Sequence, residues 1–253
     1  MKHLPNILTL GNLFFGCIAI AFILHAQPFV REVNGEQYWV SGTTQAYYGS
    51  ICILIAALLD VLDGMAARWL GVHSPLGKDL DSLADLVSFG VAPAMILLNM
   101  LWAAWMQSPD AMDISMLAMS PAFLLPCFGA LRLARFNNSI PTTAYFTGVP
   151  IPAVGLLVAS FPLINFYDSL GMGKRLQNPW LLYLVILILC WLMVSKLKLF
   201  TLKFNAFSFK KYWPQITWFA LSLIFLPLTG YLTIPISFLL YILLSFAYKH
   251  ETL

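Results

Sequence analysis

The sequence has few charged residues. Of its 253 residues only 10% are Asp, Glu, Lys or Arg, whereas 60% are hydrophobic. A soluble domain of ordinary composition carries about 25% charged residues, so this chain cannot cover its surface with groups that favour water. The deficit excludes an ordinary soluble globular protein and predicts a polytopic membrane protein, a single membrane domain over residues 1–253. The net charge of +3 is too small to indicate nucleic-acid binding.

Cysteine is also scarce, and its spacing excludes a cysteine metal site. The four cysteines lie in separate apolar runs and form no CxxC pair, so each is interpreted as a small buried or lipid-facing residue. They are Cys17, Cys52, Cys127 and Cys190. The first apolar stretch follows only a weak basic segment and lacks a small-residue cleavage site, so we expect a retained helix rather than a removed signal peptide.

Long apolar runs dominate the chain instead. A hydrocarbon core about 30 Å thick needs roughly 20 apolar residues per helix. The sequence therefore predicts an all-α transmembrane helix bundle of six to eight helices, with eight favoured. The predicted spans are 7–26, 47–69, 81–106, 114–134, 149–169, 179–200, 214–229 and 231–248. The last two lie so close together that a re-entrant hairpin is the alternative to two full spans.

The placement of Lys and Arg predicts the orientation. If the N-terminus is cytoplasmic and the spans alternate, eleven of these residues lie inside and three outside, and both termini are cytoplasmic. The inner residues are Lys2, Arg68, Lys78, Arg132, Arg135, Lys196, Lys198, Lys203, Lys210, Lys211 and Lys249. The outer residues are Arg31, Lys174 and Arg175. The basic segment 196–211 either serves only as a topology signal or also rests on anionic headgroups.

Acidic residues are scarce but concentrated. Of the 11 acidic residues, five fall within 26 positions, and Asp60 and Asp63 interrupt an otherwise apolar helix. A carboxylate there costs several kcal/mol unless it is paired or binds a metal ion. Asp60 and Asp63 are i, i+3 neighbours, and Asp81 and Asp85 are i, i+4 neighbours, so each pair occupies one helix face. A short connection joins the two helices, and we expect antiparallel neighbours whose carboxylates converge near the inner membrane surface.

Four converging carboxylates need positive charge, and the nearby Arg68 and Lys78 are too few to supply it. Hard divalent cations with oxygen ligands are the natural partners. The alternative, a polar network that only fixes helix packing, would need basic partners in similar number. Asp79 lies off the shared face at the predicted helix start, where we expect capping or exposure to solvent.

Small residues accompany both acid pairs. Gly64 follows the first pair directly, and with Ala67 it leaves a helix face without long side chains, which lets a ligand approach the backbone. Gly77 precedes the second pair and relaxes the start of that helix. Ser74 and Ser82 are both candidates to assist the site.

The segment 60–85 resembles a family signature. It reads Asp60-x-x-Asp63-Gly64-x-x-Ala67-Arg68 and, eight residues later, Gly77-x-x-x-Asp81-x-x-x-Asp85. At these positions and gaps the chain resembles the CDP-alcohol phosphotransferase family. The resemblance implies two Mg²⁺ or Mn²⁺ ions held by Asp60, Asp63, Asp81 and Asp85, with Asp85 also acting as the general base. It further implies that Gly64, Ala67, Arg68 and Gly77 border the CDP-lipid, and that the protein is a homodimer.

Three other segments resemble one branch of that family, the membrane-type phosphatidylserine synthases. They are PNILTLGNLFFG at 5–16, ALRLARFN at 130–137 and FTGVPIPA at 146–153. This resemblance implies transfer of a phosphatidyl group from CDP-diacylglycerol to L-serine by direct displacement, giving phosphatidylserine and CMP. A different acceptor, glycerol 3-phosphate or inositol, is the nearest alternative. A cation transporter is the alternative from another class, because intramembrane aspartates also line ion paths.

Further polar residues are candidates for substrate contacts. Arg132 and Arg135 lie at the inner end of the fourth predicted helix, and a guanidinium group binds a carboxylate bidentately. They are candidates to contact serine or a lipid phosphate, with membrane anchoring as the alternative. Asn6, Thr9 and Asn12 recur on one side of the first helix. They are candidates to line the nucleotide pocket, with capping and packing as the alternative.

Overall fold

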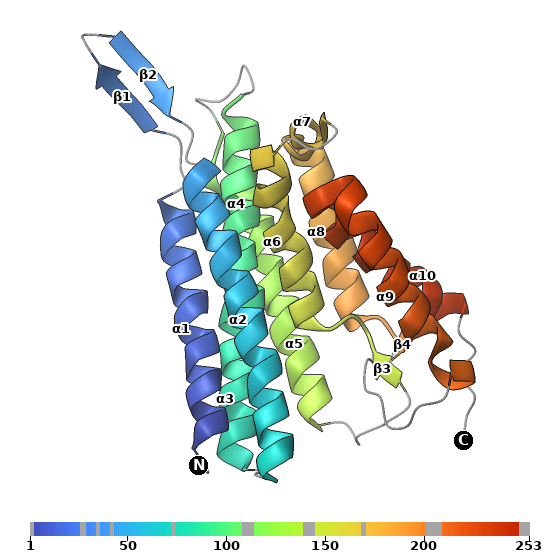
Figure 1. Cartoon of the computed structure of the whole chain (residues 1–253). Helices are drawn as coiled ribbons and strands as arrows, with labels where there is room; N and C mark the ends of the chain where they lie inside the picture. Colours follow the sequence, from blue (N-terminus) through green and yellow to red (C-terminus); the bar gives the residue numbers. More distant parts are fainter. Residues whose placement is uncertain are drawn as a thin grey trace.

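The structure is a computed structural model that describes residues 3–25, 29–33, 36–40, 43–71, 74–107, 114–138, 145–167, 171–200 and 209–247. Expectations for Lys2, Lys203 and Lys249 lie outside the described residues, as do those for the side chains of Arg31, Lys174, Lys210 and Lys211. Within the described ranges the chain is a bundle of helices with two small antiparallel strand pairs (Figure 1).

The elements follow one another along the chain with short connections. The helices are α1 (Leu4–Leu24), α2 (Thr43–Leu70), α3 (Pro75–Asp85), the π-helix η1 (Leu86–Val91), α4 (Ala92–Trp105), the 3₁₀-helix η3 (Met116–Phe123), α5 (Leu124–Asn138), α6 (Ile151–Tyr167), α7 (Met172–Leu176), α8 (Pro179–Val194), α9 (Phe209–Thr229), the 3₁₀-helix η5 (Gly230–Leu232) and α10 (Thr233–Ala247). The strands are β1 (Phe29–Val33), β2 (Glu36–Val40), β3 (Tyr145–Thr147) and β4 (Lys198–Phe200), paired β1–β2 and β3–β4.

Five helical stretches are long and apolar enough to cross a membrane, and two shorter apolar helices, α6 and α8, accompany them. The five are Leu4–Leu24, Thr44–Leu70, Pro75–Trp105, Met116–Asn138 and Trp213–Ala247. The predicted all-α transmembrane bundle is therefore confirmed, and the chain is a multi-pass membrane protein.

The last of these stretches is a hairpin of α9 and α10. The indole N–H of Trp218 donates to the Ser237 carbonyl at 2.9 Å, although the two residues are 19 positions apart. Gly230, at the turn, has a φ of +56°, a conformation that favours glycine. Because α10 has 15 residues, it is about 22 Å long, which is shorter than a hydrocarbon core. The segments predicted at 214–229 and 231–248 thus form a helical hairpin.

The strands were not predicted from the sequence. The β1–β2 hairpin occupies the polar interruption after α1 and projects from the end of the bundle opposite the start of α1 (Figure 1). The sixth predicted span, 179–200, is too long, because α8 ends at Val194 and Ser195 is already extended. The chain then pairs with the segment before α6, where Gly148 N–H donates to the Leu197 carbonyl at 2.9 Å. This pairing, which joins distant residues, ends the helix.

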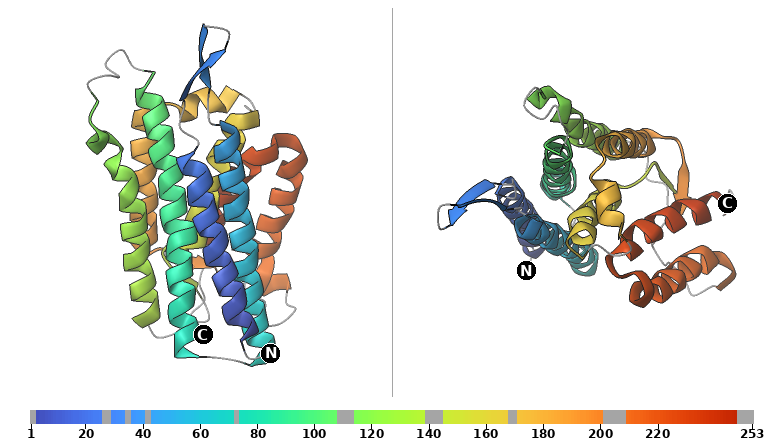
Figure 2. Two further views of the ribbon diagram at one scale, coloured as in Figure 1. Left: turned by 90° about the vertical axis from the view of Figure 1, so that its left-hand side faces the viewer. Right: turned by 90° about the horizontal axis from the view of Figure 1, so that it is seen from above.

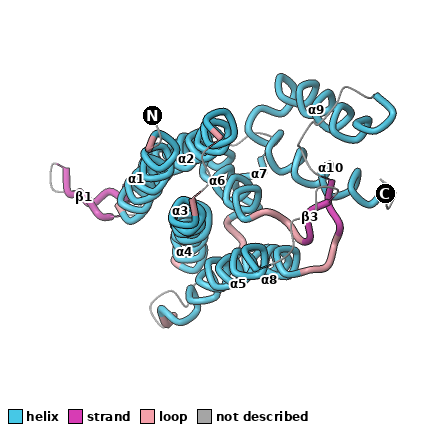
Figure 3. The backbone as a smooth tube through the Cα atoms, turned by 90° about the horizontal axis from the view of Figure 1, so that it is seen from below, coloured by secondary structure: helices cyan, strands magenta, loops and turns pink. Residues whose placement is uncertain are grey.

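Helix α6 is the centre of the bundle. It packs against α2 and α4 on one side and against α10 on another, and in the view from below it lies between the α1–α2 pair and the α9–α10 hairpin (Figure 3). Because its side chains are apolar on every face, it can be buried from all sides. The α9–α10 hairpin stands at one edge of the bundle, away from α1 (Figure 2, right). The fold thus has an N-terminal part and a C-terminal part on either side of α6.

Helix directions decide which residues meet at each end of the bundle. One end of the bundle, the lower end in Figure 1, holds the first residues of α1 and α3 and the last residues of α2 and α5. Among the described side chains, those with positive charge at this end are Arg68, Lys78, Arg132, Arg135, Lys196 and Lys198, whereas Arg175 of α7 lies at the other end. The described basic residues are thus separated between the two ends in the way that the sequence predicts.

Candidate active site

The start of α3 is fixed by a cap. The Ser74 hydroxyl accepts a hydrogen bond from the Gly77 N–H at 3.0 Å, and Pro75 occupies the first turn, where its missing N–H costs nothing. The helix therefore begins at Pro75, earlier than the predicted start at residue 81. Asp79 lies inside the helix and is exposed, so the expectation of solvent contact is confirmed and the expectation of capping is wrong.

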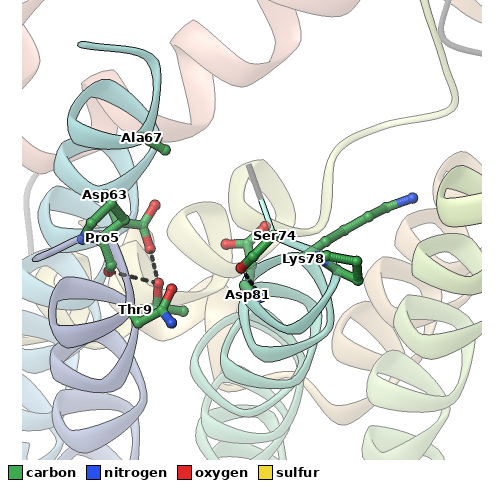
Figure 4. A pocket seen from close by; sticks show the side chains of 11 residues that line it. Pro5, Thr9, Asp63, Ala67, Ser74, Lys78 and Asp81 are labelled. Atoms are coloured by element: carbon green, nitrogen blue, oxygen red, sulfur yellow. Dashed lines mark hydrogen bonds between the residues drawn. The ribbon is translucent and has the colours of Figure 1, made fainter. Parts of the chain in front are cut away.

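The two acid-bearing helices, α2 and α3, run antiparallel as neighbours, and their carboxylates converge, as the sequence predicts. Helix α1 packs against both of them, and at their ends they face each other across a cavity of about 500 Å³ (Figure 4). Helix α1 approaches closely because Gly16 has no side chain. A Cβ there would lie only 2.9 Å from the Cα of Ser88 in η1. The space between α2 and α3 stays open because α1 supports both from one side.

Three carboxylates meet beside this cavity. One oxygen each from Asp60, Asp63 and Asp81 can be chosen so that all lie within 4.8 Å of one another. Oxygen ligands that are about 2.0–2.6 Å from a hard cation lie at most about 4–5 Å apart, so these carboxylates already stand at the separation that one ion requires. An all-carboxylate donor set also suits Mg²⁺, Ca²⁺ or Mn²⁺ rather than softer metals. The group fits a divalent cation, as the sequence predicts.

Asp85, the fourth predicted ligand, lies outside this group of three. It is deeper in the bundle, with 8% of its surface exposed, and its carboxyl group contacts that of Asp60. It accepts a hydrogen bond of 3.4 Å from the Asn12 amide. Arg132 is close enough to interact electrostatically with Asp85. Asp85 therefore links the group of three carboxylates to two buried polar side chains, Asn12 and Arg132.

Helix α1 holds both acid pairs through neutral polar side chains. The Thr9 hydroxyl lies 2.7 Å from Asp63 Oδ2, to which it can donate, and 3.0 Å from the Pro5 carbonyl. Asn12 is fully buried; its side-chain amide N–H donates to Asp85, and its backbone carbonyl accepts a hydrogen bond from the Ser88 hydroxyl. Sequence reasoning assigned both residues to the nucleotide pocket and missed these contacts, which only the packing of α1 reveals.

The cavity contains most of the residues predicted to contact the CDP-lipid. Its lining is Pro5, Asn6, Thr9, Asp63, Gly64, Ala67, Ser74, Pro75, Gly77, Lys78 and Asp81. A Cβ added to Gly64 would meet nothing within 4 Å, so a ligand can approach the α2 backbone there. Two predicted residues lie elsewhere, because Arg68 points to the exterior and Asn12 is buried below the cavity. Pro5, Pro75 and Lys78 were missed as lining residues, although Pro5 directly precedes Asn6 and Lys78 directly follows Gly77, which was a usable signal.

The two candidate serines have different roles. Ser74 caps α3 and lines the cavity, as described above. The Ser82 hydroxyl accepts from the Asn137 amide at 2.8 Å, and the Lys78 ammonium donates to the Asn137 carbonyl at 2.9 Å. Ser82 therefore belongs to a contact between α3 and the end of α5, and Ser74 is the serine at the cavity.

The structure separates the two candidate arginines. Arg132 has 8% of its surface exposed, and its guanidinium carbon lies 5.8 Å from the centre of the Phe136 ring. Its Nε is buried without a hydrogen-bond partner among the residues that the structure describes. Arg135, three residues later on α5, is exposed. Only Arg132 points into the protein beside Asp85.

A π-helix follows Asp85 directly. The Ala92 N–H bonds to the Val87 carbonyl, and the next residue, Pro93, has no N–H to continue the regular ladder. Single π-turns inside helices are frequent at functional sites. Here the π-helix buries Ser88, which holds Asn12, and so it fixes the support of Asp85.

Comparisons with known proteins match the part of the chain that contains these residues. The family model described as CDP-alcohol phosphatidyltransferase matches residues 2–191. The chain is 30% identical over 198 residues to the CDP-diacylglycerol–serine O-phosphatidyltransferase of Bacillus subtilis, covering 78% of this chain and 90% of that protein. It is 32% identical over 228 residues to the enzyme of the same name from Helicobacter pylori, covering 88% and 80%.

A third relative is archaeal. The chain is 38% identical over 124 residues to the archaetidylserine synthase of Methanothermobacter thermautotrophicus, a match that spans about half of each protein, 48% in both cases. The family model covers the carboxylate group, the cavity and Arg132 together. This chain belongs to the CDP-alcohol phosphatidyltransferase family.

Proposed function

We propose that the protein is a CDP-diacylglycerol–serine O-phosphatidyltransferase. It transfers the phosphatidyl group of CDP-diacylglycerol to the hydroxyl of L-serine and releases CMP. The observation that carries the proposal is the group of three carboxylates beside a cavity of about 500 Å³, within the usual 300–1,000 Å³ of small-molecule sites. The names of the bacterial relatives support serine as the acceptor.

Asp60, Asp63 and Asp81 would hold the metal, and Asp85, in contact with Asp60, completes the set of four. We propose two Mg²⁺ or Mn²⁺ ions, as the family signature implies. Bound there, divalent cations neutralise charge on the pyrophosphate and on the leaving CMP. The residues of the cavity bind the cytidine end, where Gly64 lets the ligand lie against the backbone of α2.

The displacement itself needs a base. The serine hydroxyl oxygen bonds to the phosphorus of the phosphatidyl group, and the bond from that phosphorus to the CMP oxygen breaks. CMP leaves with the bonding electron pair, and the hydroxyl proton passes to Asp85. A carboxylate within reach of the hydroxyl can take this proton. Asp85 suits the role because it contacts the group of three only through Asp60 and lies close enough to Arg132 to interact with it electrostatically.

Serine binds on the side of Arg132 in this proposal. The cavity for the cytidine end includes neither Asp85 nor Arg132, so the acceptor approaches from the opposite side of the carboxylates. The Arg132 guanidinium, whose Nε is buried without a hydrogen-bond partner among the described residues, would bind the serine carboxylate. Glycerol 3-phosphate carries more negative charge, for which one buried arginine with Arg135 turned outward offers a weaker match.

The test is CMP release by the purified protein. It should be measured with CDP-diacylglycerol and separate samples of serine, glycerol 3-phosphate and inositol. We expect release with serine and the phospholipid product in equal amount. Release with another alcohol but not with serine would keep the family chemistry and refute the acceptor.

The active site and both termini are proposed to be cytoplasmic. The concentration of described basic residues at the site end of the bundle supports this orientation. Cysteine labelling tests it in a variant without the four native cysteines. Asn138→Cys, at the end of α5, should resist an impermeant thiol reagent in intact cells, whereas Arg175→Cys, in α7, should react. The reverse pattern would invert the topology.

A homodimer is also part of the proposal, on the strength of the family resemblance. Native mass spectrometry of the protein released from detergent should give twice the chain mass. A single chain mass under conditions that preserve activity would refute it.

A further inference from the structure

A second cavity lies in the C-terminal part of the bundle, between α6 and the α9–α10 hairpin. It is an open groove of about 430 Å³ with an almost wholly apolar lining. Its residues are Pro150, Pro152, Ala153, Leu156, Trp218, Ser222, Thr233, Ile234, Ser237, Phe238 and Tyr241. None of these residues belongs to the carboxylate group or to the nucleotide cavity.

The few polar groups in the groove already have partners within the protein. The hydroxyls of Ser222 and Ser237 lie 2.8 Å apart, and that of Thr233 lies 3.0 Å from the Thr229 hydroxyl. The Tyr241 hydroxyl donates to the Phe200 carbonyl at 3.1 Å. The Trp218 indole donates to the Ser237 carbonyl, as described above. A polar ligand or ordered water would find little to bind, because apolar cavities of this kind stay dry and accept hydrocarbon.

The groove comes near the active-site region at one residue, Tyr241. Tyr241 lines the groove and also lies close enough to Arg132 to interact with it electrostatically. Arg132 in turn interacts with Asp85. Pro150 marks the same end of the groove, because α6 begins there, next to the β3–β4 pair. Hydrocarbon in the groove would thus extend away from the carboxylates, along α6 and α10.

We propose that this groove holds one acyl chain of the CDP-activated lipid. The occupant must be hydrocarbon because the polar groups of the groove already have partners within the protein. The reacting lipid is favoured over bulk lipid because Tyr241, which lines the groove, lies near Arg132, and Arg132 in turn interacts with Asp85. The inference rests on the proposed function. It assigns the α9–α10 hairpin to substrate binding, whereas the family model ends at residue 191, before that hairpin.

Photolabelling of the intact protein tests the occupant directly. CDP-diacylglycerol with a diazirine in one acyl chain should label peptides of α6 and α10 that line the groove. Unlabelled CDP-diacylglycerol should suppress this labelling, whereas phosphatidylcholine in equal excess should not. Equal suppression by phosphatidylcholine would assign the groove to bulk lipid and overturn the proposal, as would labelling confined to other helices.

A filling variant tests the consequence for catalysis. Ala153→Phe places a ring in the groove, and Ala21→Phe on the exposed surface of α1 is the matched control. We expect the apparent KM for a long-chain CDP-diacylglycerol to rise about three- to tenfold in Ala153→Phe, because packing rather than hydrophobic transfer drives association in lipid. The KM for serine, and that for a CDP-diacylglycerol with two eight-carbon chains, should change less than twofold.

The outcomes separate the two proposals. If wild-type protein releases no CMP with serine but still shows competed labelling in the groove, the acceptor is wrong and the lipid site stands. If wild-type protein is active with serine, and folded Ala153→Phe protein has normal KM values, the proposed lipid site is refuted and the proposed function stands. Thermal unfolding of both variants shows whether they are folded, and the labelling of wild-type protein needs no variant.

Discussion

The cavity between α2 and α3 and the groove between α6 and the α9–α10 hairpin are similar in size and opposite in chemistry. The first, of about 500 Å³, adjoins carboxylates that accept hydrogen bonds from two neutral side chains of α1, Thr9 and Asn12. The second, of about 430 Å³, contains polar groups that bond to one another. Unbalanced charge in a membrane protein indicates a ligand that carries the opposite charge, whereas satisfied polar groups indicate a structural role. The two regions should therefore respond in opposite ways to metals and to lipid chains.

Removal of metal should produce the largest difference between them. Chelation with EDTA should abolish CMP release, and excess Mg²⁺ or Mn²⁺ should restore it, because the carboxylates otherwise repel one another and the substrate pyrophosphate. Photolabelling in the groove by a simple diazirine fatty acid should be unaffected and serves as the control. Full CMP release after exhaustive chelation would show that the carboxylates beside the cavity need no divalent cation, and would refute the proposed metal site.

Substitution of Asp85 should impair turnover, whereas substitution of Asp60 should impair binding, although both reduce activity. Asp85→Asn keeps an oxygen ligand but cannot take a proton, so turnover should fall roughly 10²–10⁴-fold while metal and CDP-diacylglycerol still bind. Asp60→Asn removes charge from the group of three and should weaken both metal and substrate binding. Calorimetry and CMP release on the same preparations distinguish the two. Normal turnover in Asp85→Asn, or unchanged binding in Asp60→Asn, would refute these roles.

Thr9 should act on the metal through Asp63. Thr9→Val removes the hydroxyl 2.7 Å from Asp63 Oδ2 and should reduce Mn²⁺ affinity about 10- to 100-fold, the usual effect of losing a partner that orients a ligand. Thr9→Ser keeps the hydroxyl and should bind Mn²⁺ nearly as wild type does. Titration calorimetry measures both. Equal affinities in the Val and Ser variants would show that this hydrogen bond does not position the ligand.

Arg132 and Arg135 form a matched pair that separates binding from anchoring. Arg132→Ala should raise the apparent KM for serine roughly tenfold, because hydrogen bonds to charged groups contribute about 1.5–3 kcal/mol. Arg135→Ala, on the exposed face, should leave this KM within twofold. Steady-state kinetics with each substrate varied in turn provides the measurement. A larger effect for Arg135 would place the acceptor outside the bundle.

The smallest effect is expected in the groove. Ser237→Ala removes the hydroxyl that meets Ser222 and should lower the free energy of unfolding by about 0.6 kcal/mol, the average for hydrogen bonds between membrane helices. Metal affinity and the KM for serine should be unchanged. Reversible unfolding in mixed micelles and Mn²⁺ titration are the measurements. A change in metal affinity would show that the two regions are coupled rather than independent.

The sequence predicted the convergence of Asp60, Asp63 and Asp81 because spacing on a helix is local. Asp60 and Asp63 share a face at i, i+3 whatever the rest of the chain does, and an uncompensated acid in an apolar helix is costly in any fold. The scarcity of charge likewise predicted the transmembrane bundle. By contrast, the early start of α3 depended on Ser74 and Pro75, a local cap signal that was present but not used.

The sequence by itself therefore determined that the chain is a helical membrane protein with a carboxylate site. The tertiary structure decided which other side chains surround that site. It placed α1 against both acid-bearing helices, buried Asn12 beneath Asp85, turned Arg132 inward and Arg135 outward, and formed the groove beside α6. The physical reason is that these features depend on contacts between residues far apart in the chain, such as Gly16 with Ser88. No local pattern encodes which helix packs against two others.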